Sequence, residues 1–180
     1  MADVVTRSTE PTLAAIKLAW WRERLEDLDQ GKVPAEPRLR AAATELLPRG
    51  ISGADLSRLE ESWALLLRTD DPTGFMRGVA GRGPAIFALA ARLLGVPFDD
   101  RLHDAANSFV AADLARRRIT EMPPQKLSRS RIRSTAKARP LTAFAAIARR
   151  DMRSGGPPFE PEAWPGRAWA LLRHRLTGRY

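Results

Sequence analysis

Apolar residues recur along this chain at the three- and four-residue spacing that is typical of amphipathic helices. The first predicted helix covers residues 10–30, with Thr9 as its N-cap, Pro11 in its first turn and Gly31 at its end. Two rows of apolar side chains make one broad face on this helix: Leu13, Ile16 and Trp20 in the first row, and Leu18, Trp21, Leu25 and Leu28 in the second. We expect at least one of the two tryptophans to be substantially buried.

Prolines and glycines separate the later helices, which we predict over 37–47, 52–67, 72–93, 100–119, 140–152 and 165–176. Ser52 and Asp55 have the spacing of a capping box. The predicted helix 72–93 is interrupted by glycines, each of which costs up to about 1 kcal/mol relative to alanine. We therefore expect a neighbouring helix backbone to approach it closely. These glycines are Gly74, Gly78, Gly81 and Gly83.

The chain contains little β-branched, strand-forming sequence, which argues against a βαβ nucleotide-binding core. Its 180 residues are a normal size for one compact domain. We therefore predict an all-α fold, a single-domain helical bundle over 1–180. Residues 116–139 form a basic segment within it, and from residue 125 they are poor in large apolar groups, which indicates either a surface helix or a mobile loop.

The composition excludes several kinds of site. Cysteine is absent, so the chain has no disulfide, thiolate nucleophile or cysteine-ligated metal. His103 and His174 are the only histidines, too few for a multi-histidine metal site. No uncharged stretch is long enough for a transmembrane helix, and the first residues lack a signal-peptide core, so we expect a cytoplasmic protein, or one peripheral at the membrane.

Charge is distributed unevenly along the chain. Residues 1–115 hold 14 basic and 17 acidic residues, a balance of −3, whereas residues 116–180 hold 16 basic and 4 acidic, a balance of +12. This asymmetry favours an anionic partner, although a general abundance of arginine would produce it as well. Nucleic acid is the least favoured partner, because the basic stretch has no interleaved aromatic residues before Phe144 and no recognition motif.

Carboxylate spacing offers one catalytic possibility. Asp100 and Asp104 are four residues apart, so they share one helix face and form a weak candidate magnesium site. The alternative is that acids in a first helical turn stabilise the positive end of the helix dipole. No nucleophile triad, phosphate-binding glycine loop or zinc motif accompanies them.

Residues 10–26 read EPTLAAIKLAWWRERLE. This segment resembles the signature of the squalene/phytoene synthase family, in which a Glu-Pro pair precedes a Trp-Trp-Arg triplet. The matching residues are Glu10, Pro11, Trp20, Trp21 and Arg22. Weaker matches follow in the family's order, so the similarity spans nearly the whole chain.

The resemblance implies a shortened isoprenoid-synthase fold. Members of that family join two prenyl diphosphates head to head, with magnesium held by two aspartate-rich helices. Only nine residues precede the signature here, too few for the first aspartate motif. In the second motif Asp113 matches the first position, but Arg116 and Arg117 occupy the positions of the acid pair. Two cations cannot hold magnesium, so the chain departs from the family pattern at both motifs.

We therefore expect a degenerate family member without a cofactor, which binds a prenyl or lipid diphosphate, an anionic membrane surface or a protein partner. Arg116, Arg117 and Arg118, with Asp113, are the candidate ligand-binding residues, because guanidinium charge can replace magnesium charge at a diphosphate. A solvated basic helix end is the plainer interpretation of these arginines. The alternative function is an active, magnesium-dependent prenyl transferase of terpenoid, carotenoid or hopanoid biosynthesis, completed by a partner chain.

Overall fold

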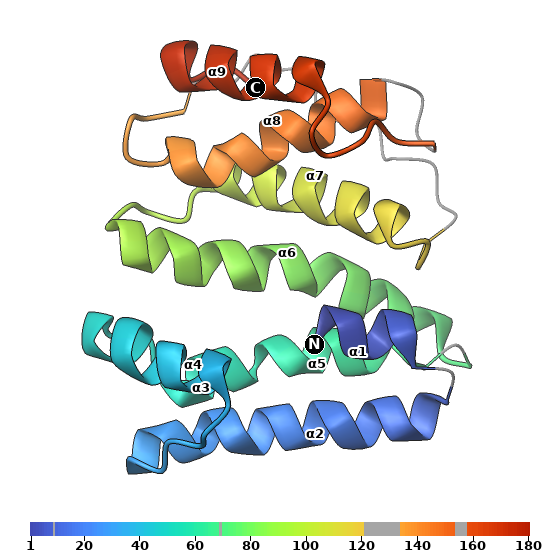
Figure 1. Ribbon diagram of the computed structural model, residues 1–180. Helices are drawn as coiled ribbons and strands as arrows, with labels where there is room; N and C mark the ends of the chain where they lie inside the picture. Colours follow the sequence, from blue (N-terminus) through green and yellow to red (C-terminus); the bar gives the residue numbers. More distant parts are fainter. Residues whose placement is uncertain (9, 69, 121–133, 154–157) are drawn as a thin grey trace. The chain divides into compact units, whose positions relative to one another are not determined.

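The structure is a computed structural model that describes residues 1–8, 10–68, 70–120, 134–153 and 158–180. Its regular structure is helical, with no β-strand among these residues, which confirms the all-α prediction. The helices, labelled in Figure 1, are α1 (Ala2–Arg7), α2 (Pro11–Asp27), α3 (Pro37–Ala41), α4 (Gly53–Ser57), α5 (Leu59–Leu66), α6 (Pro72–Leu94), α7 (Asp100–Arg116), α8 (Arg139–Arg153) and α9 (Pro165–Thr177). Shorter 3₁₀ or π turns cover Leu28–Gln30, Ala42–Leu46 and Leu47–Arg49.

The chain divides into two compact units, unit 1 (Met1–Ala85) and unit 2 (Ile86–Tyr180). The division falls inside α6, so that its first part belongs to unit 1 and its last part to unit 2. The N-cap of α2 is Glu10, with no side-chain cap hydrogen bond, and not Thr9 as predicted. Thr9 itself and most of the segment 125–139 lie outside the described residues.

Helix α2 is the centre of unit 1 and packs against α1, α4 and α5. Its second apolar row is buried at Leu18, Leu25 and Leu28, and Trp21 is half-buried against the cluster that Leu25 and Leu28 form with residues of α3. The first row is exposed, with Leu13, Ile16 and Trp20 at 45%, 61% and 43% of their free surface. The broad face predicted for this helix is thus buried along one row only.

Capping interactions fix where the short helices of unit 1 begin. The predicted capping box is present: Ser52 Oγ accepts from the Asp55 N–H at 2.9 Å, and Asp55 Oδ2 accepts from the Ser52 N–H at 3.2 Å. The Asp29 carboxylate accepts from the backbone N–H groups of Gly53 and Ala54, at 2.6 and 2.9 Å. These bonds satisfy donors that the first turn of α4 leaves unpaired, and they join α4 to the 3₁₀ turn that follows α2.

The glycines of α6 have the predicted role at one position. A Cβ atom on Gly78 would lie 2.8 Å from the Ser62 carbonyl oxygen and 2.9 Å from Leu65 Cβ, both on α5. Glycine is therefore required there by the close approach of the α5 backbone. At Gly81 the nearest atom is the Ser62 hydroxyl oxygen at 3.2 Å, which can move.

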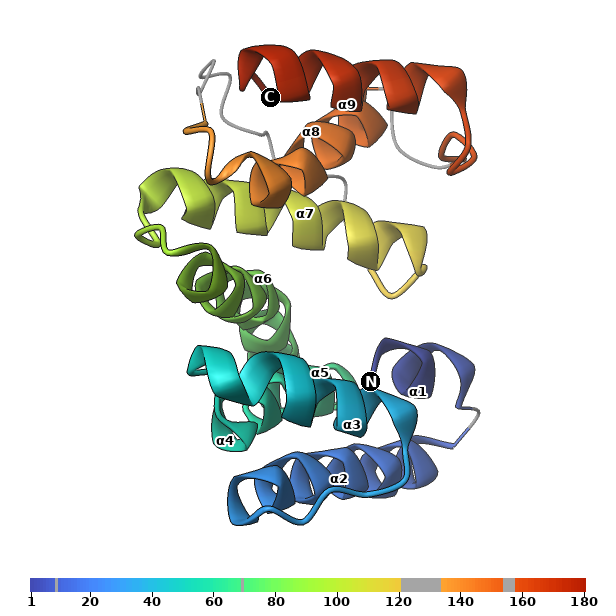
Figure 2. The same ribbon diagram turned by 60° about the vertical axis from the view of Figure 1, so that its left-hand side comes forward.

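In unit 2, helix α8 packs against α7 on one side and α9 on the other, and both views show this order (Figures 1 and 2). Helix α7 ends at Arg116, three residues before its predicted end. The buried hydrophobic core of unit 2 consists of Phe87, Ala91, Leu102, Ala105, Ala106, Ala138, Leu141, Ala145, Ala146 and Tyr180. His174 of α9 is buried, and its ring nitrogens lie 3.1 Å from Thr142 Oγ1 and 3.1 Å from the Arg179 carbonyl oxygen. The contact with Thr142 joins α9 to α8, and the contact with Arg179 fixes the chain that follows α9.

Candidate functional site

Unit 2 contains a pocket of about 440 Å³ between α7, α8 and α9. Its walls are mostly apolar, and its polar side chains are two arginines and two aspartates. The lining residues are Phe109, Ala112, Asp113 and Arg116 of α7, Ala143, Phe144, Ile147, Ala148 and Asp151 of α8, and Arg167 and Leu171 of α9. A pocket of this size accommodates a ligand as large as a typical cofactor or drug.

Helical spacing places one face of each helix in this pocket. The α7 residues at 109, 112, 113 and 116 and the α8 residues at 144, 147, 148 and 151 follow the same i, i+3, i+4, i+7 spacing. Phe109 meets Phe144 with ring centroids 5.6 Å apart, whereas Arg116 meets Asp151 seven residues further along both helices. The pocket therefore has an aromatic end and an ionic end, separated by about 10 Å along the helices.

Asp151 is the centre of the ionic end. Its side chain is only 1% exposed, and both of its oxygens accept from Arg116, from Nε and Nη2, at 2.8 Å each. Arg167 Nη1 also donates to Oδ1 of the same carboxylate. The hydrogen bond to Asp151 raises the pKa of Arg116 above its ordinary value. Two positive charges thus share one buried negative charge.

A second ion pair supports this cluster from the loop before α9. Glu160 accepts from Arg150 Nε and Nη2 at 2.7 and 2.8 Å, and this hydrogen bond lowers the pKa of Glu160. The Glu160 carbonyl oxygen accepts from Arg116 Nη2 at 3.3 Å, and the Phe159 ring lies 4.7 Å from the Arg116 guanidinium carbon. Arg116 is therefore held on three sides.

The four candidate ligand-binding residues lie in different environments. Arg116 and Asp113 line the pocket. Arg117 donates to Asp113 from Nε, at 3.1 and 3.0 Å, and is not among the lining residues. Arg118 is exposed beyond the end of α7, with a left-handed backbone φ of 57°. The structure brings Arg116 together with Asp113, but it does not gather the three arginines around one site.

The family-signature residues all lie in unit 1. Glu10 precedes α2 as its N-cap, and Pro11 is its first residue. The rings of Trp20 and Trp21 meet edge to face, with centroids 5.2 Å apart. Arg22 Nη1 lies 3.9 Å from Oε2 of Glu60, a buried carboxylate whose pKa is raised by burial, against the opposing effect of Arg22. The Arg22–Glu60 pair joins α2 to α5, and none of the five signature residues lines the unit 2 pocket.

The structure places no further metal ligand, among the residues that it describes, beside Asp100 and Asp104, the weak candidate magnesium site. Asp100 and Asp104 are both exposed on α7. No group of three or more aspartates, glutamates or histidines suited to a metal ion occurs among the described residues. The carboxylates of the pocket, Asp113 and Asp151, are bonded to arginines. The donor set found there fits guanidinium groups rather than a divalent cation.

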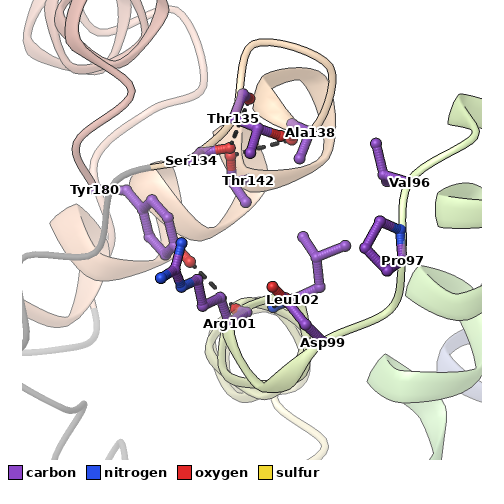
Figure 3. A pocket seen from close by; sticks show the side chains of 10 residues that line it. All are labelled: Val96, Pro97, Asp99, Arg101, Leu102, Ser134, Thr135, Ala138, Thr142 and Tyr180. Carbon is purple, nitrogen blue, oxygen red and sulfur yellow. Dashed lines mark hydrogen bonds between the residues drawn. The ribbon is translucent and has the colours of Figure 1, made fainter.

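A second cavity of about 60 Å³ lies where α7 begins (Figure 3). Tyr180, which lines it, donates a hydrogen bond from its hydroxyl to the Arg101 carbonyl oxygen at 3.2 Å. Asp99 beside it caps α7 by accepting from the Leu102 N–H at 3.0 Å. The volume is enough for a few water molecules only, so this cavity is a packing feature and not a ligand site.

Sequence reasoning missed Asp151 and Arg167 as well as the aromatic wall. Asp151 is an acid with arginines at 149, 150 and 153, and such an isolated acid in a basic helix is a signal for a buried ion pair. Arg167 had no comparable signal, because its distance from Asp151 depends on how α8 and α9 pack.

No protein-family profile, no curated protein and no solved structure matches this chain at a significant level. None of the helices in the described part of the chain is long and apolar enough to cross a membrane.

Proposed function

We propose that unit 2 binds a prenyl or lipid diphosphate in the three-helix pocket. On this proposal the chain is a squalene/phytoene synthase-like protein that binds its ligand without turning it over. The observation that carries the proposal is one pocket with an apolar aromatic wall at one end and two guanidinium groups at the other.

The apolar wall suits a hydrocarbon chain. Phe109, Phe144, Ile147 and Leu171 offer aromatic and branched side chains, and Phe144 is 54% exposed. A hydrocarbon chain that covers these side chains removes apolar surface from water, which favours binding by about 25 cal/mol per Å² buried. The roughly 10 Å between the aromatic and ionic ends matches a chain of several carbon atoms joined to a charged head.

The ionic end suits a diphosphate head. Arg116 and Arg167 carry two positive charges and share the one carboxylate of Asp151, while the second carboxylate of the lining, Asp113, is paired with Arg117. Among the described residues, Arg116 Nη1 and the Nε and Nη2 groups of Arg167 have no hydrogen-bond acceptor. Arginine N–H groups bind phosphate oxygens in pairs, so these donors can hold the head group. Asp151 acts as a positioning residue, because it fixes both guanidinium planes before ligand arrives.

The test is a calorimetric titration with farnesyl diphosphate, farnesol and inorganic pyrophosphate, with a chelator present. We expect farnesyl diphosphate to bind, and the apolar and charged fragments to bind at least about tenfold more weakly, because each engages one end of the pocket only. Arg116→Lys keeps the charge but loses the fork of donors, and Arg167→Gln loses both. Each should weaken farnesyl diphosphate binding about tenfold or more.

Arg118→Gln is the matched control, since Arg118 is exposed and does not line the pocket. This variant loses one positive charge, as Arg167→Gln does, and it loses it from the run 116–118 that contains Arg116. The affinity of Arg118→Gln for farnesyl diphosphate should equal that of the unchanged protein. An equal loss in Arg118→Gln and Arg167→Gln would mean that general basic charge, and not this pocket, attracts the ligand.

A second arm tests turnover. The protein is incubated with magnesium and farnesyl or geranylgeranyl diphosphate, and we expect no squalene, phytoene or presqualene-type product. Magnesium-dependent pyrophosphate release that disappears when Asp100 and Asp104 are both changed to alanine would establish the active transferase instead.

A further inference from the structure

The outward face of α9 is apolar, and it is separate from the pocket. Trp169, Leu172 and Leu176 are 65%, 45% and 70% exposed. Their spacing of three and four residues places them within an arc of about 60° on the helix. His174 and Arg167 lie on the opposite side, where His174 is buried and Arg167 bonds Asp151. The apolar stripe therefore points away from the body of unit 2.

Basic side chains border this stripe. Arg173 and Arg175 are exposed and lie on either side of it at helical spacing. Residues 163–180 contain four arginines and no aspartate or glutamate. Leucine and tryptophan on one face with arginines at its edges is the arrangement of helices that lie in the interface of a bilayer. Tryptophan is enriched at the membrane–water interface, and arginine pairs with lipid phosphates.

Helix α2 supplies a useful contrast. Its exposed row of Leu13, Ile16 and Trp20 has the same spacing, but its borders carry both signs of charge, with Lys17 and Glu23. Exposed apolar residues therefore occur on both helices, but of the two only α9 has a border that is wholly basic. Complementarity of charge points to an anionic surface as the partner of α9.

We propose that the outward face of α9 docks on the surface of an anionic phospholipid bilayer. Trp169, Leu172 and Leu176 enter the interface, and Arg173 and Arg175 remain at the level of the lipid phosphates. The helix lies in the plane of the membrane and does not cross it. This docking does not depend on the ligand of the pocket, whose lining residues are on the other side of α9.

Sedimentation with lipid vesicles tests the docking. Vesicles of phosphatidylcholine alone are compared with vesicles of equal parts phosphatidylcholine and phosphatidylglycerol. We expect binding to the anionic vesicles only, and release as sodium chloride is added. Arg173→Gln and Arg175→Gln should each weaken partitioning about fivefold, the equivalent of about 1 kcal/mol per basic residue at the surface. Leu172→Gln should weaken it at least about tenfold.

Ile16→Gln on α2 is the matched control and should partition like the unchanged protein. Circular dichroism checks that each variant is folded, and farnesyl diphosphate titration of Leu172→Gln in solution separates this docking from pocket binding. Equal partitioning into neutral vesicles, or no vesicle binding at all, would overturn the proposal. So would a dimer in analytical ultracentrifugation that Leu172→Gln abolishes, because a second copy of the chain would then cover this face.

Discussion

Replacing Asp151 by alanine should destabilise unit 2 strongly. Its carboxylate is 1% exposed and holds two guanidinium groups, with Arg116 at 25% and Arg167 at 11% side-chain exposure. Removal leaves two like charges close together in a partly buried site. Breaking a buried ion pair from one side costs about 3–5 kcal/mol, and the partial exposure of Arg116 places the expected loss near the lower end, at about 3 kcal/mol.

Urea unfolding followed by circular dichroism measures this loss, and hydrogen exchange shows whether it falls in residues 86–180. Glu45→Ala is the control, because it breaks an exposed pair with Arg49 whose side chains are 64% and 63% exposed. That change should cost about 0.3–0.5 kcal/mol. If Asp151→Ala lowers the free energy of unfolding by less than about 1 kcal/mol, the Asp151 cluster contributes no more than an exposed ion pair, and the reasoning is refuted.

A triple variant separates stability from binding. Arg116→Met, Asp151→Leu and Arg167→Met together replace the ion cluster with apolar side chains of similar size. Replacement of a whole buried ion cluster is often neutral or stabilising, so the triple variant should recover most of the stability that Asp151→Ala loses. It should nevertheless bind no farnesyl diphosphate, because both phosphate-binding arginines are gone.

Three further predictions concern unit 1. Trp21→Ala should cost about 2 kcal/mol in urea unfolding, because Trp21 is half-buried, whereas Trp20→Ala on the exposed row should cost much less. Gly78→Ala should lower the melting temperature despite the better helix propensity of alanine, while Gly81→Ala should leave it nearly unchanged or raise it. Burial raises the pKa of Glu60, so the folded state binds its proton more tightly than the unfolded state. The stability of the unchanged protein relative to Glu60→Gln should therefore rise as the pH falls through that raised pKa, and a pH-independent difference would contradict this.

Local signals were sufficient to predict the fold class. The capping box of Ser52 and Asp55 and the proline at the start of α2 each act within one helical turn. The sequence therefore predicts where these helices begin. The six-residue helix α1 was not predicted, because it is too short to show a period. The choice between the two apolar rows of α2 depends on which neighbours pack there, and the sequence alone did not decide it.

The pocket was only partly predictable for the same reason. Arg116 and Asp113 were identified through the family resemblance. Arg116 lies four residues after Ala112 and seven after Phe109, on a helix face that spacing can locate. Asp151 and Arg167 are 35 and 51 positions further along the chain than Arg116. Their meeting is a result of tertiary packing, for which no local pattern is informative.

Photochemical labelling tests the central claim most directly. A farnesyl diphosphate analogue with a diazirine at the far end of its chain is bound to the 180-residue protein and irradiated, and the labelled residues are located by mass spectrometry. The account predicts labels on residues at the aromatic end of the pocket, on Phe109, Phe144, Ile147 or Leu171, and their loss when farnesyl diphosphate competes. Labelling confined to unit 1, or labelling that farnesyl diphosphate does not displace, would contradict it.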